Sequence, residues 1–232
     1  MKKLALLALA LSACTAVDSD NILTSGMFAS MSARATGDGT TTVEATLFLG
    51  NPSNLDYIDL TADDQLVASH DGDDKVMVEQ NVLNVISHFA TFQTEAEGAE
   101  LVVDFQRTVD DGAPESVLTL PAPFELDPVA ASISRAQPMT LSWTPGAADL
   151  MKWNATGDCI EFTFEPAIAA GADTLAIAAN TIHKRQDMAV ADTCLVTVTM
   201  TRSRFGDIDP NYGEGGSAVA EQVRTLTFTS TP

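Results

Sequence analysis

From about residue 27 onward, the sequence alternates between apolar and polar residues in short runs separated by Asp, Gly and Pro. In residues 42–49, for example, Val43, Ala45 and Leu47 fall on one face of an extended chain, whereas Glu44 falls on the other. A period of two is the signature of a half-buried β-strand. The pattern therefore predicts an all-β fold made of many short strands.

Two stretches need separate argument. Residues 167–180 are rich in alanine, but Gly171 interrupts them and strand-like runs flank them, so we predict a loop followed by a strand. Residues 85–92 suit a strand, although their apolar spacing also fits a helix.

Hairpin turns are expected at Asp71-Gly72 and Asp111-Gly112. The other runs that we interpret as strands are residues 57–60, 65–69, 75–79, 100–107, 116–120, 131–135, 139–143, 159–164, 175–182, 194–202 and 223–229.

A proline-rich break divides this pattern into two halves. Pro121-Ala122-Pro123 places two prolines in three residues, which interrupts any central strand. Each half then holds six to eight expected strands, the number found in an immunoglobulin-like sandwich. We therefore predict two immunoglobulin-like β-sandwich domains in tandem, over residues 26–120 and 121–232.

The N-terminus has the pattern of an export signal. Met1-Lys2-Lys3 is basic, residues 4–11 are apolar but too short to span a membrane, and Leu11-Ser12-Ala13-Cys14 follows. This resembles the lipobox of bacterial lipoproteins, which implies cleavage after residue 13 and acylation of Cys14. An ordinary secretory signal that contains a cysteine is the alternative. We predict a signal peptide over residues 1–13 and a lipidated tether over residues 14–25.

The mature chain is strongly acidic. Loss of Lys2 and Lys3 leaves 10 of the 12 Lys and Arg residues against 32 Asp and Glu, a net charge of −22. Nucleic acid is a poor partner for such a surface. By resemblance to Gram-negative lipoproteins, Thr15 stands where an Asp commonly causes retention at the inner membrane. The resemblance thus implies lipid anchoring in the outer membrane, with the face left open.

With Cys14 acylated, two cysteines remain. An even pair in an exported chain favours a disulfide between Cys159 and Cys194. Metal binding is the alternative, but there is no Cys-x-x-Cys spacing and no nearby pair of histidines to support it.

Two short segments resemble known families. Residues 139–145 (MTLSWTP) resemble the second strand of a fibronectin type III domain, in which an inward Trp alternates with aliphatic residues. The resemblance covers seven residues, and neither Tyr57 nor Tyr212 lies where that family has its tyrosine corner. Arg204-Phe205-Gly206, Asp209-Pro210 and Gln222-Val223-Arg224 are similar to segments of uncharacterised Gram-negative lipoproteins, a likeness that implies no activity.

The sequence carries no catalytic motif that we can identify. It lacks a Gly-x-Ser-x-Gly elbow, a His-Glu-x-x-His zinc helix, a phosphate-binding loop and a dinucleotide fingerprint. Of its three histidines, His70 adjoins a turn, His88 lies in an apolar strand, and His183 precedes Lys184 and Arg185. We therefore expect a protein that is not an enzyme.

One acidic loop has the composition of a cation site. Oxygen-bearing side chains recur in Asp207, Asp209, Asn211 and Glu214, as in loops that wrap Ca²⁺. Gly213 is one place late for an EF-hand, and Pro210 stiffens the loop. A polar hairpin connection is the competing interpretation, so Ca²⁺ is the one cofactor worth testing.

Three functions remain open. The first is a cell-envelope lipoprotein without enzymatic activity whose loops bind an envelope protein or a glycan, since exposed loops on rigid sandwiches commonly serve recognition. The second is a Ca²⁺-dependent adhesion or glycan-binding module that uses the 207–214 loop. The third, a hydrolase assembled from distant residues, has no support in the sequence.

Overall fold

The computed structural model describes residues 16–50, 56–61, 63–186 and 190–232. Its regular structure there consists of 18 strands and two three-residue 3-10 turns, η1 (Ser19–Asn21) and η2 (Thr24–Gly26). The prediction of an all-β fold is confirmed. None of these residues forms a helix that is long and apolar enough to cross a membrane.

One large sheet runs the length of the molecule, in the order β1-β4-β3-β2-β18-β17-β14-β15. The central strand β18 pairs with β2 in parallel and with β17 in antiparallel orientation. The strands along the sheet are β1 (Ala16–Asp18), β4 (Tyr57–Asp59), β3 (Thr41–Leu49), β2 (Met27–Ala35), β18 (Ser217–Thr231), β17 (Cys194–Phe205), β14 (Leu150–Thr156) and β15 (Thr163–Ile168). Three further strands pair at its margins, β8 (Val85–Phe92) with β3, β7 (Val78–Val82) with β8, and β12 (Ser132–Ser134) with β18.

Two small sheets complete the fold. One has four strands in the order β10-β9-β5-β6, and the other has three in the order β11-β13-β16. Their bounds are β10 (Ala113–Thr119), β9 (Glu100–Gln106), β5 (Gln65–His70), β6 (Asp73–Val76), β11 (Glu125–Leu126), β13 (Met139–Thr144) and β16 (Thr174–Ile177).

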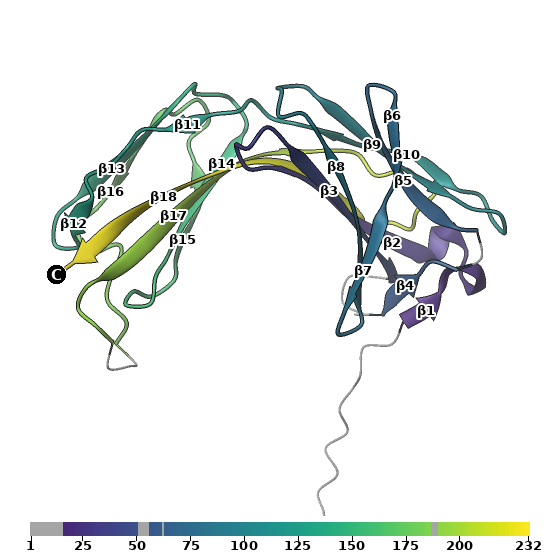
Figure 1. The fold of residues 1–232 in the computed structure, drawn as a ribbon, viewed down its shortest axis with the longest axis horizontal. Helices are drawn as coiled ribbons and strands as arrows, with labels where there is room; N and C mark the ends of the chain where they lie inside the picture. Colours follow the sequence, from purple (N-terminus) through teal and green to yellow (C-terminus); the bar gives the residue numbers. More distant parts are fainter. Residues whose placement is uncertain (1–15, 51–55, 62, 187–189) are drawn as a thin grey trace, which may run out of the picture.

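The molecule is an arch with two lobes (Figure 1). The large sheet follows the concave side, and each small sheet covers one end of it on the convex side. We call the end with β10-β9-β5-β6 the first lobe and the end with β11-β13-β16 the second lobe. Each lobe is a two-layered β-sandwich, and the long strands β17 and β18 pass from one to the other.

Several local predictions are confirmed. Residues 85–92 form β8, and residues 167–180 form the end of β15, a turn and β16, with no helix. Asp71 and Gly72 both have positive φ, 50° and 81°, as a two-residue hairpin turn between β5 and β6 requires. In β13, Leu141 and Trp143 are buried on one face, as the alternation predicts.

The two lobes have separate apolar cores. The second core contains only residues that follow the proline-rich break, from Phe124 to Phe228, and it holds both tryptophans. The first core contains residues 27–120 but also takes Tyr212, Ala218 and Ala220 from the C-terminal part of the chain. The lobes are therefore two sandwiches that share strands, and the first is completed by residues from beyond the break.

The N-terminal residues are packed onto the first lobe. The segment predicted as a tether, residues 14–25, is described from Ala16, where β1 pairs in parallel with β4. Arg107 is buried and donates to the carbonyls of Ser19 and Ile22 at 2.6 and 2.9 Å, and it pairs with Asp64 at 3.0 Å. From Ala16 onward the predicted tether is thus part of the sandwich.

Candidate functional site at the junction of the lobes

The junction is built on β17 and β18. Residues 217–222 of β18 pair with β2 of the first lobe, and residues 229–231 of the same strand pair with β12 of the second lobe. On β17, Arg202 lies directly opposite Gln222 of β18, and Arg204 lies opposite Ala220. Cross-strand partners share a face, so these polar side chains point to the convex side, where the linker between the lobes runs.

Arg202 is fully buried and holds that linker in place. Its guanidinium donates to the carbonyls of Ala122 and Pro145 at 2.8 and 2.6 Å, and more weakly to that of Pro123 at 3.4 Å. The ring of Phe124 lies 4.9 Å from the guanidinium carbon. Loss of hydration in this buried position lowers the Arg202 pKa from its ordinary value.

The preceding linker carbonyls are held in the same way. Arg204 donates to the carbonyl of Leu120 at 3.2 Å and forms a two-pronged pair with Asp149 at 2.8 and 3.1 Å. Gln222, which is also fully buried, donates to the carbonyl of Pro121 at 3.3 Å. Four successive linker carbonyls, at residues 120–123, thus accept hydrogen bonds from side chains of the shared strands.

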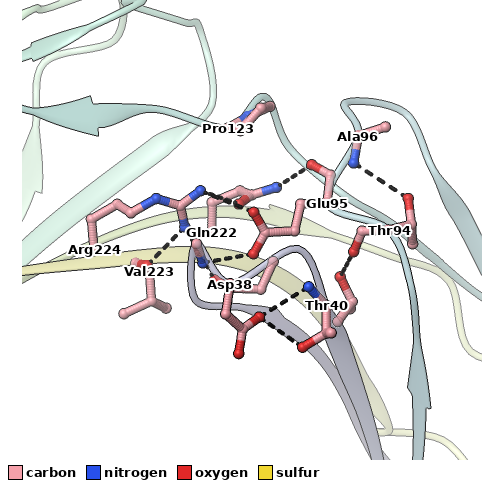
Figure 2. A network of polar contacts seen from close by, with 12 residues as sticks. Asp38, Thr40, Thr94, Glu95, Ala96, Pro123, Gln222, Val223 and Arg224 are labelled. Carbon is pink, nitrogen blue, oxygen red and sulfur yellow. Dashed lines mark hydrogen bonds and ion pairs between the residues drawn. The ribbon is translucent and has the colours of Figure 1, made fainter.

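Figure 2 shows how this network continues to the β2–β3 turn. Arg224 donates to the side-chain oxygen of Gln222 at 3.2 Å and pairs with the carboxylate of Glu95 at 3.5 Å. The other carboxylate oxygen of Glu95 accepts from the backbone N–H of Gly37 at 2.6 Å, and the Glu95 carbonyl accepts from Gln222 at 2.8 Å. A nearby Asp38–Thr40 contact closes the same turn.

On the concave side of the junction, another acidic residue joins strands of the two lobes. Glu221 of β18 lies between Arg34 of β2 and Lys152 of β14, with N–O distances of 3.3 and 3.2 Å. Both cations are about half exposed, so each pair contributes little to stability. The pairs nevertheless link one strand from each lobe through β18.

An open groove of about 910 Å³ lies beside this network. Arg224 and Glu95 form part of its lining, together with the buried ring of Phe124. The full lining is Thr36, Gly37, Glu95, Pro123, Phe124, Glu125, Leu126, Thr144, Pro145, Arg224 and Thr225. Residues from both lobes line the groove, and hydrogen bonds and an ion pair hold two of its polar side chains, Glu95 and Arg224, in place.

In the loop predicted to hold Ca²⁺, one proposed ligand is already engaged by the fold. The carboxylate of Asp209 is buried and accepts from the backbone N–H groups of Glu115 and Asn211, both at 2.8 Å. The Asn211 amide donates to the Gly112 carbonyl at 2.6 Å. The bonds to Glu115 and Gly112 fasten the loop to β10 and to the connection before it in the first lobe.

The remaining predicted ligands do not join Asp209. Asp207 pairs through its backbone with Val117 and has an exposed side chain, and Glu214 is exposed. Within the described ranges, no three His, Cys, Asp or Glu side chains are grouped so that they could hold a metal ion. Between Asp209 and Glu214 lies the buried Tyr212, whose ring stacks on Phe105 at 6.1 Å.

The cysteines fall in different regions. Cys14 lies outside the described residues. Cys159 and Cys194 are bonded through their sulfur atoms, with their Cα atoms 5.7 Å apart, and they join the start of β17 to the chain that follows β14. The bond closes one end of the second lobe.

The histidines also occupy separate places. His88 is buried in β8, where loss of hydration lowers its pKa. His183 is half exposed and bonded to the carboxylate of Glu161 at 2.7 Å, a contact that raises the His183 pKa. His70 donates from its Nδ1–H group to the Glu100 carbonyl at 2.8 Å, in the first lobe. The structure does not bring these three histidines together.

Reasoning from the sequence missed the junction residues, although one signal for them was present. Val196, Val198 and Met200 occupy the inward face of β17, and the next residue on that face is Arg202. A cationic side chain that follows apolar residues on the inward face of a strand is expected to be buried, and a buried charge needs hydrogen-bonding partners. On β18 the neutral Gln222 is likewise buried on the inward face, and Arg224 follows it on that face, partly buried.

Comparisons with known proteins give a fold-level likeness only. No protein-family model matches the chain, and no curated protein matches it. Solved structures with a similar fold include the N-terminal four Ig domains of Dscam1 isoform 8.4, at 15% identity, a TM-score of 0.22, and coverage of 83% of this chain and 42% of that one. The Yersinia pseudotuberculosis adhesin InvE is 14% identical, with a TM-score of 0.23 and coverage of 86% and 58%.

A third similar structure is SGBP-B of the Bacteroides ovatus mixed-linkage glucan utilization locus, solved in complex with a mixed-linkage heptasaccharide. It is 9% identical, with a TM-score of 0.22 and coverage of 95% of this chain and 68% of that one. The present chain spans about half the length of the first two structures. TM-scores this low carry no functional argument.

Proposed function

We propose that this protein is a lipoprotein of the bacterial cell envelope that binds a protein or glycan partner and is not an enzyme. The observation that carries the proposal is the junction groove, which the two lobes line jointly and which the shared strands hold open. Two of its polar residues, Glu95 and Arg224, are held by hydrogen bonds to the fold, as expected for a rigid recognition surface.

Lipid attachment at Cys14 is the proposed anchor, with the outer membrane as the proposed location. The support is the lipobox and the Thr at position 15. Because β1 begins at Ala16, only Thr15 separates the proposed lipid from a paired strand. An anchored protein would therefore carry its first lobe directly at the membrane surface and its second lobe at the other end of the arch.

The anchor is tested by metabolic labelling with an alkyne fatty acid. We expect label on the wild-type protein and none on Cys14→Ala, which should be released or remain unprocessed. Equal labelling of the two proteins would contradict the anchor and leave the groove proposal standing.

The groove is tested with a photoreactive amino acid placed at Thr225, which is exposed and lines it. Thr140, an exposed threonine of β13 outside the groove, is the matched control position. We expect irradiated envelopes to yield a covalent adduct from position 225 only, and protease or glycosidase digestion of the adduct will separate a protein partner from a glycan. Adducts at both positions, or at neither, would contradict a binding role for the groove.

A further inference from the structure

Strand β7 has an open edge and two exposed valines. It pairs with β8 along one side, and no strand in the described part of the chain pairs with its other side. All five of its residues are exposed, with Val78 and Val82 exposed by 65% and 64%. Sheet edges are usually protected by charged side chains, Pro or a bulge; β7 has no Lys, Pro or bulge, and its one charged residue is Glu79.

The register of the hairpin shows which backbone groups are free to pair. Val82 and Val85 flank a two-residue turn, Leu83 and Asn84, whose φ angles of 54° and 65° are those of a type I′ turn. The pair that closes such a turn exchanges both backbone hydrogen bonds, and alternation gives Gln80 and Val78 the same role toward β8. The N–H and C=O groups of Glu79 and Asn81 therefore point away from β8, to the open edge.

The sequence of β7, Val-Glu-Gln-Asn-Val, is symmetric in character about Gln80. We propose that β7 is a homodimer interface, in which a second copy of this chain pairs antiparallel with β7 about a twofold axis at Gln80. Glu79 then exchanges two backbone hydrogen bonds with Asn81 of the other copy, and the symmetric pair adds two more. Val78 packs against the second copy's Val82, on the face that Phe89 and Val85 of β8 extend.

Competing registers are less favourable. If the second copy slides along β7 by one residue, backbone groups that point to the open edge in one copy face groups that point toward β8 in the other. Only a slide by an even number of residues, which moves the twofold axis to a neighbouring residue, keeps the hydrogen bonds between the copies. Centring the pair on Glu79 places two carboxylates directly opposite each other, which is destabilising. Centring it on Asn81 sets Val82 against Gln80 and breaks the valine pairs.

The proposed interface is small. Five residues on each side fall short of the roughly 800 Å² per partner that specific, stable complexes bury. We therefore expect a weak dimer in solution, whose mass rises with protein concentration. Attachment of both copies to one membrane, if the proposed anchor is present, would strengthen it by raising the effective concentration.

The register is tested by cysteine scanning in the full mature chain, with Cys14→Ser to remove the anchor. In the proposed register Gln80→Cys faces its own copy across a pair without backbone hydrogen bonds, where Cα atoms lie about 4.5 Å apart and a disulfide can form. Glu79→Cys and Asn81→Cys are matched neighbours that do not face themselves. Under mild oxidation we expect Gln80→Cys to form the linked dimer at least tenfold faster than either neighbour.

Faster linkage of Glu79→Cys or Asn81→Cys, or equal rates for all three, would overturn the proposed pairing. Sedimentation velocity provides a second test. Gln80→Lys places two cations opposite each other and should abolish the rise in mass with concentration, whereas Thr91→Lys, an exposed change on β8 away from the edge, should preserve it. A mass that stays monomeric throughout, together with flotation of the protein on phosphatidylcholine vesicles, would assign the apolar hairpin to membrane contact and overturn the dimer.

Discussion

The two lobes have the same architecture but differ in what completes them. The second lobe takes its core from one continuous stretch of chain after the proline-rich break and closes one end with a disulfide. The first lobe needs residues from both sides of that break, because Tyr212, Ala218 and Ala220 fill its core and β18 covers the edge of β2. Similar sandwiches in one chain therefore need not be equally autonomous, and we expect the first lobe to depend on the second because β18 belongs to both.

The largest expected effect comes from separating the lobes. A chain of residues 121–232 keeps the whole second core and its disulfide, so we expect it to fold and unfold cooperatively. A chain of residues 16–120 loses three buried core residues and the partner of β2, and we expect it to remain unfolded. Circular dichroism and amide NMR dispersion measure both. A 16–120 chain that folds would contradict the claim that the first lobe needs residues from beyond the proline-rich break.

Removal of the buried cation at the junction should weaken the contact between the lobes. Arg202→Met leaves the Ala122 and Pro145 carbonyls buried without a donor, and hydrogen bonds to charged groups contribute about 1.5–3 kcal/mol each. We expect a loss of about 3 kcal/mol in the free energy of unfolding, measured by urea titration. Arg34→Met, which removes a half-exposed ion pair on the same sheet, is the control and should cost about 1 kcal/mol or less.

The 207–214 loop should stabilise the first lobe through Asp209 and not through a cation. Asp209→Ala leaves the N–H groups of Glu115 and Asn211 without their acceptor, at a cost of about 1–3 kcal/mol. Asp207→Ala removes an exposed carboxylate from the same loop and should have little effect. Thermal melts in millimolar CaCl₂ and in NaCl of equal ionic strength should agree. A rise in Tm that is specific to calcium and that both variants lose would instead show that the loop binds Ca²⁺.

The lobes should respond to pH in opposite directions, with the smallest effects. Burial lowers the pKa of His88, so its contribution to the first lobe is complete above the unfolded value of about 6.5 and is lost as the pH falls below it. The Glu161 contact raises the pKa of His183, so its contribution to the second lobe is complete below about 6.5 and is lost as the pH rises through the raised value.

NMR titration of the two imidazoles measures these shifts directly. His88→Gln should reduce the acid sensitivity of the first lobe, and Glu161→Gln should return His183 to an ordinary pKa. An ordinary pKa for His88 in the native protein would contradict its burial.

The alternation of apolar and polar residues predicted many of the strands, because a half-buried strand imposes that period directly. It did not single out β2 or β14, it joined β6 and β7 into one run over residues 75–79, and it began β15 at residue 159 although the strand starts at Thr163. It predicted β8 and the inward faces of β3 and β13. It did not predict that β18 would be shared, because strand pairing between residues about 190 positions apart leaves no local pattern. The composition of the 207–214 loop also leaves its role open. A carboxylate such as that of Asp209 can serve as a cation ligand or as an acceptor for backbone N–H groups, and the sequence does not separate the two.

The dependence of the first lobe on the second is tested most directly by amide hydrogen exchange after removal of the disulfide. Cys159→Ser with Cys194→Ser opens a loop with a sequence separation of 35, which should cost about 3–4 kcal/mol in the second lobe. Arg107→Ala instead destabilises the first lobe alone. We predict that the disulfide variant speeds exchange in β14 and β17 and also in β2 and β3, whereas Arg107→Ala speeds exchange in β2 and β3 only. Protection of β2 and β3 that survives loss of the second lobe would contradict the account.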